Sequence, residues 1–170
     1  ESVSFEFDLH HPPEKVWRAL TDPVLLAEWL LPVVDLKLEP GASFTFKTQP
    51  YPGWDGTVNC RFVEIEAHRK LSYTWVVAGM LDTVVTFTLT PTASGTRLSL
   101  VQSGFKPDQE QNFGGARYGW RMMGGKLVDL LLARIDDPDS ERPYERVIAD
   151  FTIVGRESTL GDAAPDVPAP

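Results

Sequence analysis

The sequence predicts an α+β fold in which a curved antiparallel sheet of about seven strands wraps around a long C-terminal helix. Between residues 33 and 103 most segments alternate apolar and polar side chains, the pattern of strands with one buried face. Helical spacing of apolar residues is confined to a short region after the first strand and to residues 113–135. A chain of 170 residues is most simply one domain with a real core.

One strand and two short helices precede the sheet region. Residues 3–9 (VSFEFDL) alternate apolar and polar side chains, which predicts a half-buried strand. The following HHPPEKVWRAL changes to helical spacing, and Pro13 suits the first turn of a helix. Asp22 can cap a second helix that starts at Pro23 and carries an apolar stripe as far as Leu30. We therefore expect two consecutive short helices after the first strand.

Six further strand segments follow, separated by turns that contain mainly Gly, Pro and Ser. Their alternation places aromatic residues on one face and Ser and Thr on the other, as in a sheet with one covered face. The third segment changes phase near Phe62 and Val63, so we expect a β-bulge there. The predicted segments are residues 33–38, 42–48, 56–65, 70–77, 82–90 and 96–103.

The long helix predicted over residues 113–135 contains five glycines, each of which costs about 0.5–1 kcal/mol relative to alanine in a helix interior. Helical spacing places Gly124 on the side that faces the sheet, beside Trp120. Two interpretations compete: either the helix touches the sheet closely at Gly124, or the missing side chain keeps a cavity open. The sequence interpretation favours a cavity next to Trp75, Phe87 and Trp120.

The last part of the chain differs from the rest in composition. Residues 136–170 hold nine acidic residues and three arginines, so they carry −6 of the net charge of −8. We expect a folded domain over residues 1–135 and an acidic, Pro-rich tail over 136–170 whose end is disordered. Residues 144–154 are apolar enough to dock, either as a strand or arm on their own domain or on the mate in a homodimer. We expect them to cover the apolar flank of the long helix, which consists of Met122, Val128 and Leu132.

Composition excludes several classes of function. No apolar run approaches the roughly 18–20 residues of a membrane helix. A phosphate backbone would be repelled by the acidic chain, so we expect no nucleic-acid partner. Three histidines, of which His10 and His11 are expected in a solvated turn and His68 in an exposed one, are too few for a zinc site. The single Cys60 excludes an internal disulfide and is typical of a cytoplasmic protein.

Five stretches in order carry a resemblance to a known family: VWRALTDPVLLAEWL, LEPGASFTF, KLSYTW, VTFTLTPTASGTRLSL and YGW. Together they resemble the family named for the activator of the heat-shock protein 90 ATPase, over about residues 3–135. The resemblance implies the helix-grip fold of START-like domains, and many members are thought to enclose a hydrophobic cavity. The eukaryotic namesake is a co-chaperone with an additional N-terminal domain. Nothing in this sequence resembles that domain.

No catalytic motif was found. The chain has no G-x-S-x-G, no H-E-x-x-H and no phosphate loop, so we expect no cofactor and no identified chemistry. Polar groups that could lie near a cavity are Asn59, Arg61, Tyr73, Asp82 and Gln102.

The hypothesis is therefore a binding domain for a small apolar molecule held between the sheet and the long helix. Two alternatives remain: a protein-interaction module acting on a chaperone ATPase, and a pocket enzyme of the polyketide cyclase or dehydratase kind. Trp54, in the loop PYPGWDG, is either a flap at the mouth of the site or a side chain folded back onto the sheet edge. The candidate ligand-binding residues are Phe44, Phe46, Tyr73, Trp75, Phe87, Trp120, Met123, Gly124 and Leu127.

Overall fold

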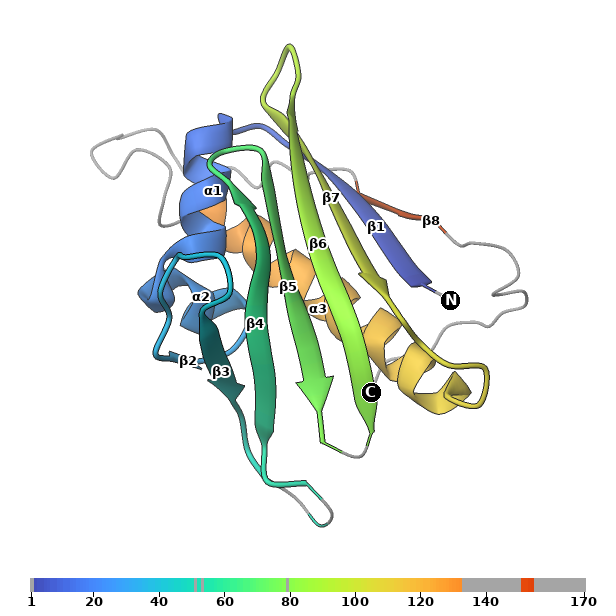
Figure 1. The fold of residues 1–170 in the computed structure, drawn as a ribbon. Helices are drawn as coiled ribbons and strands as arrows, with labels where there is room; N and C mark the ends of the chain where they lie inside the picture. The colour runs from blue at the N-terminus through green and yellow to red at the C-terminus, as the bar shows by residue number, and fades with distance from the viewer. Residues whose placement is uncertain (1, 51, 53, 79, 133–150, 155–170) are drawn as a thin grey trace.

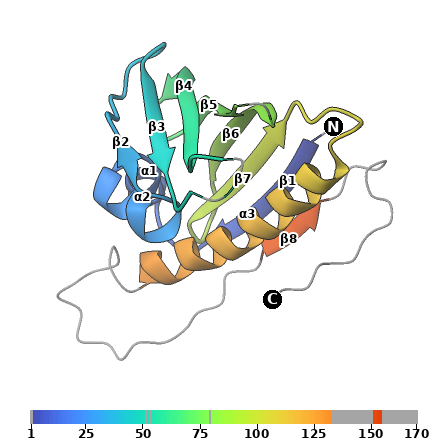
Figure 2. The same cartoon turned by 90° about the horizontal axis from the view of Figure 1, so that it is seen from below.

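The computed structural model describes residues 2–50, 52, 54–78, 80–132 and 151–154. An antiparallel sheet forms one layer, and the long helix α3 (Glu110–Leu130) runs across its covered face (Figure 1). Two short helices, α1 (Pro13–Thr21) and α2 (Pro23–Trp29), close the end of the sheet next to its first strands (Figure 2). The predicted α+β helix-grip class is confirmed.

The sheet has the strand order β2-β3-β4-β5-β6-β7-β1-β8, and every neighbouring pair is antiparallel. Strands β2 to β7 follow one another in chain order, and the N-terminal strand β1 lies between β7 and β8. The strand bounds are β1 (Ser2–Leu9), β2 (Val33–Val34), β3 (Ser43–Lys47), β4 (Thr57–Glu66), β5 (Lys70–Val77), β6 (Leu81–Pro91), β7 (Thr96–Ser103) and β8 (Phe151–Val154).

Local sequence signals start the helices and shape the strands as predicted. The Asp22 carboxylate accepts a hydrogen bond from the Val24 amide (2.9 Å) and so caps α2. The register between β4 and β5 shifts between Phe62 and Glu64, which confirms the predicted bulge. The strand predicted over residues 33–38 is wrong in length, because Asp35 has a φ of +62° and ends β2 after Val34.

The tail contributes the eighth strand. Strand β8 pairs with β1, with Ser4 opposite Val154 and Phe7 opposite Phe151, so this segment docks as a strand on its own domain. It does not cover the whole helix flank within the chain, since Met122 remains 45% exposed. Val128 packs against the core and Leu132 is half-buried. Residues 133–135 of the predicted helix, residues 144–150 of the predicted docking segment and the tail from residue 155 lie outside the described residues.

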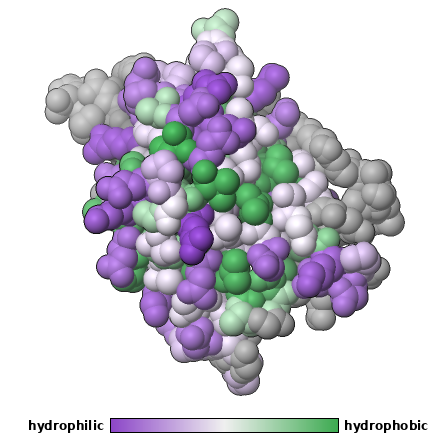
Figure 3. Space-filling model, in the orientation of Figure 1, coloured by the Kyte–Doolittle hydropathy of each residue, from purple (hydrophilic) through white to green (hydrophobic). Residues whose placement is uncertain are grey.

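The outer face of the sheet faces the viewer in Figure 1 and carries small polar and β-branched residues, such as Ser72 and Thr86, whose hydroxyls lie 3.1 Å apart. Figure 3 shows hydrophilic and hydrophobic residues interspersed on it. None of the helices in the described part of the chain is long and apolar enough to cross a membrane.

Candidate functional site

The candidate residues from β3, β5 and β6 come together as one aromatic cluster on the covered face. Strict alternation points Phe44 and Phe46 of β3 toward Tyr73 and Trp75 of β5. The ring centroids of Phe44 and Tyr73 lie 5.2 Å apart, and those of Phe46 and Trp75 lie 5.5 Å apart. Phe62 of β4, which was not among the predicted site residues, stacks 4.6 Å from Phe44. Its inward position just before the bulge was the signal that could have found it.

Trp120 joins this cluster to the long helix. Its ring centroid lies 5.4 Å from that of Trp75 and 6.2 Å from that of Phe87. Trp75, Phe87 and Trp120 therefore meet between the sheet and the helix, as predicted. Their role in ligand binding stays a prediction. All three are buried.

A buried polar network fixes the position of Trp120. Its indole N–H donates to Gln102 Oε1 (2.7 Å), and Gln102 Nε2 donates to Thr83 Oγ1 (2.9 Å). The Thr83 hydroxyl in turn donates to the Trp75 carbonyl (2.8 Å). Gln102 was predicted near the site, but Thr83 was missed, although its alternation with Val85 and Phe87 places it on the covered face. Because both side chains are buried, the network ties α3 to β5, β6 and β7 at a defined position.

The other predicted polar candidates point away from this interior. Asn59, Arg61 and Asp82 are exposed on the opposite side of their strands. Successive side chains of a strand point to opposite faces, and each of these three residues is next to an inward-facing residue. Of the five polar candidates, the fold brings only Tyr73 and Gln102 into the interior.

Tyr73 lies in the middle of the aromatic cluster and is 2% exposed. Burial raises the pKa of Tyr73 well above its ordinary 10.0, and the neighbouring Cys60 adds to the shift. Burial also raises the pKa of the Cys60 thiol to about 12, so both groups are neutral near pH 7. The thiol lies 3.9 Å from the Val58 carbonyl. Among the described residues, the buried side-chain polar atoms without a hydrogen-bond partner are Ser4 Oγ and Arg121 Nε.

Gly124 corrects the cavity prediction. A Cβ atom built on Gly124 would lie 2.5 Å from Cζ and 2.6 Å from Cε1 of Phe7, closer than real Cβ contacts. Phe7 is itself buried on β1, so its ring has little room to move away. Gly124 therefore allows close helix–sheet contact, and it faces β1 rather than Trp75 and Phe87. The tight-contact interpretation is correct and the cavity at Gly124 is wrong.

The other two predicted helix residues lie on either side of this contact. Leu127 is fully buried, and Met123 is half-buried against the core. The Met123 methyl group approaches Gly119 on the same helix, at 3.7 Å from a Cβ built there. Leu127 thus belongs to the core beside this contact, and Met123 packs against it.

Trp54 and the histidines also find definite places. The Trp54 indole donates to the Thr57 carbonyl (3.0 Å), so this half-buried side chain folds back onto the start of β4. His10 and His68 are exposed as predicted. His11 is buried, contrary to prediction, because the Thr96 hydroxyl draws its carbonyl into the β1–β7 end of the sheet (2.7 Å). Within the described ranges no group of three His, Cys, Asp or Glu residues could hold a metal ion.

Solved structures share this architecture. Protein MLL2253 from Mesorhizobium loti is 44% identical, with a TM-score of 0.70 over 77% of this chain and 96% of that one. Protein CV1439 from Chromobacterium violaceum is 27% identical, with a TM-score of 0.63 over 76% and 95%. CalU16 from Micromonospora echinospora is 26% identical, with a TM-score of 0.63 over 81% and 77%.

A search of curated proteins gave no match. The family model described as "Activator of Hsp90 ATPase homolog 1-like protein" matches residues 10–132, which include α1, α2, β2 to β7 and the described part of α3. The chain therefore belongs to the family of Activator of Hsp90 ATPase homolog 1-like proteins.

Proposed function

We propose that the protein binds a small, largely apolar molecule on the aromatic side of α3, between this helix and strands β3 to β6. The observation that carries the proposal is the uneven approach of α3 to the sheet. Among the described residues, the backbone of α3 comes close to β1 and α2 and has no comparable approach to β3, β4, β5 or β6 (Figure 2).

Large side chains bridge the wider separation. Trp75, Trp120 and Phe46 span it through ring contacts, whereas on the β1 side the helix backbone at Gly124 lies directly against the Phe7 ring. An interior bridged mainly by aromatic side chains can admit a small apolar molecule when one ring changes rotamer. Aromatic walls with few polar groups are typical of small-molecule sites. The fold supports ligand binding in general. The apolar nature of the ligand is part of the proposal.

The proposal includes no chemistry. The buried polar side chains of the described residues are Ser4, His11, Ser72, Thr83, Thr96 and Gln102. They include no acid and no Lys or Arg that could act as a general acid or base beside the aromatic cluster. The titratable groups of the aromatic cluster are Tyr73 and Cys60, whose raised pKa values keep both neutral near pH 7.

Native mass spectrometry of the freshly purified full chain tests the proposal. We expect a copurifying mass of a few hundred daltons that is released on denaturation, and binding of a neutral fluorescent apolar probe after its removal. Phe46→Leu and Phe5→Leu form a matched pair, since both rings are fully buried. Phe46 lies on the aromatic side of α3, whereas Phe5 lies on β1. Probe affinity should change in Phe46→Leu and stay unchanged in Phe5→Leu. Equal effects, or no binding at all, would contradict the proposal.

A second candidate follows from the family description, which refers to activation of a chaperone ATPase. The first proposal places the ligand inside the domain and needs no partner ATPase, so we expect this second role not to apply. Stoichiometric protein added to the cognate chaperone should leave its ATPase rate unchanged. A several-fold stimulation would favour the interaction module.

A further inference from the structure

A pair of arginines on the flank of α3 that faces β1 forms a second candidate site, separate from the proposed apolar site. We propose that Arg121, assisted by Arg117, binds the oxyanion group of a small molecule, either a carboxylate or a phosphate.

The first step is an unpaired donor. Arg121 Nε is buried and has no hydrogen-bond partner, one of two such side-chain atoms in the described part of the chain. A guanidinium group stays charged in proteins, so its N–H cannot avoid the cost of burial by losing a proton. Buried polar groups are normally hydrogen-bonded, as the Trp120 indole N–H is to Gln102 Oε1. The Arg121 Nε–H therefore lacks an acceptor, and a bound anion would supply one.

The second step is the place of the two arginines on the helix. Trp120 faces the aromatic cluster, and Gly124 faces Phe7 of β1. At about 100° per residue, Arg117 and Arg121 lie about 20° and 60° beyond Gly124 as seen from Trp120. They therefore share the flank of α3 toward β1 and its neighbour β8 (Figure 2). Both are half-buried, so part of each side chain still reaches solvent and a small anion can approach.

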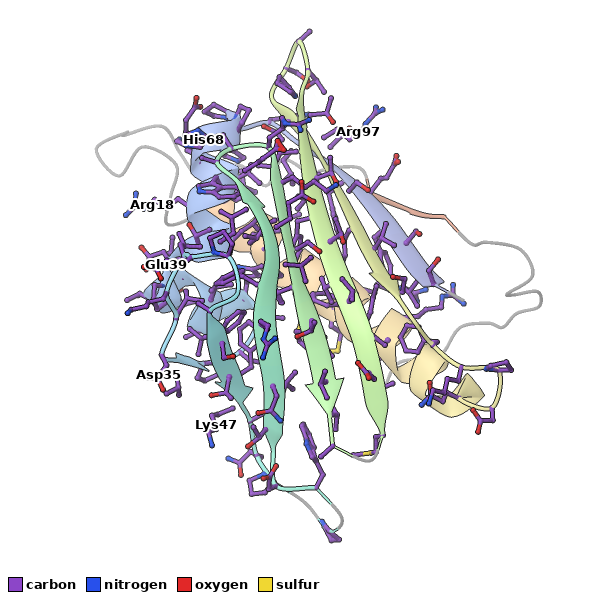
Figure 4. The ribbon with its side chains drawn as sticks, in the orientation of Figure 1. Arg18, Asp35, Glu39, Lys47, His68 and Arg97 are labelled. Atoms are coloured by element: carbon purple, nitrogen blue, oxygen red, sulfur yellow. The ribbon has the colours of Figure 1, made fainter. Side chains whose placement is uncertain are left out.

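The third step is charge. In the described part of the chain neither Arg117 nor Arg121 forms an ion pair, and no Asp or Glu lies three or four positions from either of them. Figure 4 shows Arg18 and Arg97 at the periphery of the molecule, in contrast to the buried Nε of Arg121. Other arginines have carboxylate partners: Arg18 with Asp22, Arg69 with Glu66 and Arg97 with Asp8. Two like charges one turn apart repel each other in a helix, so an anion beside them would relieve this repulsion.

The fourth step is the chemical class of the anion. One edge of a guanidinium group presents Nε–H and Nη–H side by side, in the spacing of two oxygens of a carboxylate or a phosphate. Rotation of the Arg121 side chain would present this edge to an anion that arrives from solvent. The two oxygens then accept one hydrogen bond each, and Arg117 adds a second positive charge. The site therefore favours an oxyanion over a halide ion.

Nuclear magnetic resonance of the ¹⁵N-labelled full chain tests the proposal. Inorganic phosphate and butyrate are titrated separately at constant ionic strength against sodium chloride, so the two titrations distinguish a phosphate ligand from a carboxylate ligand. The Nε–H peak of Arg121, assigned through its side-chain carbons, should move saturably with at least one of them. Because the wild-type peak reports binding directly, this result does not depend on the stability of any variant.

Three variants locate the site through the backbone amide peaks of residues 117–122. Arg121→Lys keeps the charge but removes the paired donors, so affinity should fall about tenfold. Arg117→Gln should lower affinity about two- to fivefold, as expected for one partly exposed charge. Arg61→Gln is the matched control and should change nothing, because Arg61 is exposed on β4 and also has no ion pair in the described part of the chain.

Three results would refute the site. In the first, neither phosphate nor butyrate moves the Arg121 Nε–H peak. In the second, all three variants weaken binding equally, so that only the net charge of the chain matters. In the third, the Nε–H peak already has the shift of a hydrogen-bonded group before any anion is added and stays there, so that a group of the chain itself is its acceptor.

Discussion

The two sides of α3 meet the sheet in opposite ways. On the β1 side the helix backbone lies against the sheet, and Gly124 leaves room for the ring of Phe7. On the side of β3 to β6 the backbones stand apart and Trp75, Trp120 and Phe46 fill the space. The helix therefore carries a glycine where it lies close to the sheet and a tryptophan where the two are farther apart.

This difference teaches where the domain is fixed and where it can adapt. Close backbone contact leaves no freedom, because a single added carbon at Gly124 meets a buried ring. On the aromatic side the polar network of Trp120, Gln102 and Thr83 holds one point, and the rings around Tyr73 are held by packing alone. Four substitutions test this contrast.

The largest effect is expected from Gly124→Leu. The side chain would overpack the contact with Phe7, so we expect a loss of about 3 kcal/mol in the free energy of unfolding, the upper end of the range for overpacking. Urea denaturation measures it. Combining Gly124→Leu with Phe7→Leu should recover part of the loss. A variant as stable as the wild type that no longer binds an apolar probe would bring back the cavity interpretation.

Gln102→Leu should remove the hydrogen bonds that hold Trp120 in place on the aromatic side. The Trp120 indole N–H would lose its buried acceptor, at an expected cost of about 2 kcal/mol in the free energy of unfolding. Ser103→Ala, at the next and exposed position of β7, is the control and should change stability by less than about 0.5 kcal/mol. Equal stabilities of the two variants would mean that packing alone places Trp120.

Cys60 makes the aromatic side sensitive to alkaline pH. Its pKa is about 12 in the folded chain against 9.0 for an ordinary thiol, so the unfolded state releases the proton first. The thiol's contribution to stability is therefore complete below about pH 9 and is lost as the pH rises toward 12. The loss should be on the order of 1–2 kcal/mol near pH 10.5.

The control for this pH dependence is Cys60→Ala, which lacks the thiol and should show a shallower decline in unfolding free energy between pH 8 and pH 10.5. Parallel declines would mean that the thiol ionises without unfolding. The interior around Tyr73 would then be open to water in the native state.

The smallest effect is a gain at the neighbouring glycine. A Cβ on Gly125 meets nothing within 4 Å, so Gly125→Ala should stabilise the protein by about 0.5–1 kcal/mol through helix propensity alone. Gly124→Ala, one residue earlier, should not show this gain because its Cβ meets Phe7. Equal gains at both positions would show that α3 is free to shift away from β1.

The local pattern of the chain determined most of the architecture. Alternation in VSFEFDL and KLSYTW identified the strands and their inward side chains, and a change of phase located the bulge at Phe62. Period and capping residues are properties of a few consecutive residues, so they can be read before folding. They also placed Gly124 on the sheet side of the helix, and the five family-like stretches predicted the element order.

Tertiary structure alone decided what each inward residue meets. Gly124 lies against Phe7, which is 117 positions earlier, because the backbone of α3 comes closest to the sheet at β1. The same placement of α3 brings the Trp120 indole N–H to Gln102 Oε1. Strand β8 pairs with β1 because that sheet edge is open in the folded domain. Which residues become neighbours in space depends on where the helix crosses the curved sheet, and no local period encodes that crossing.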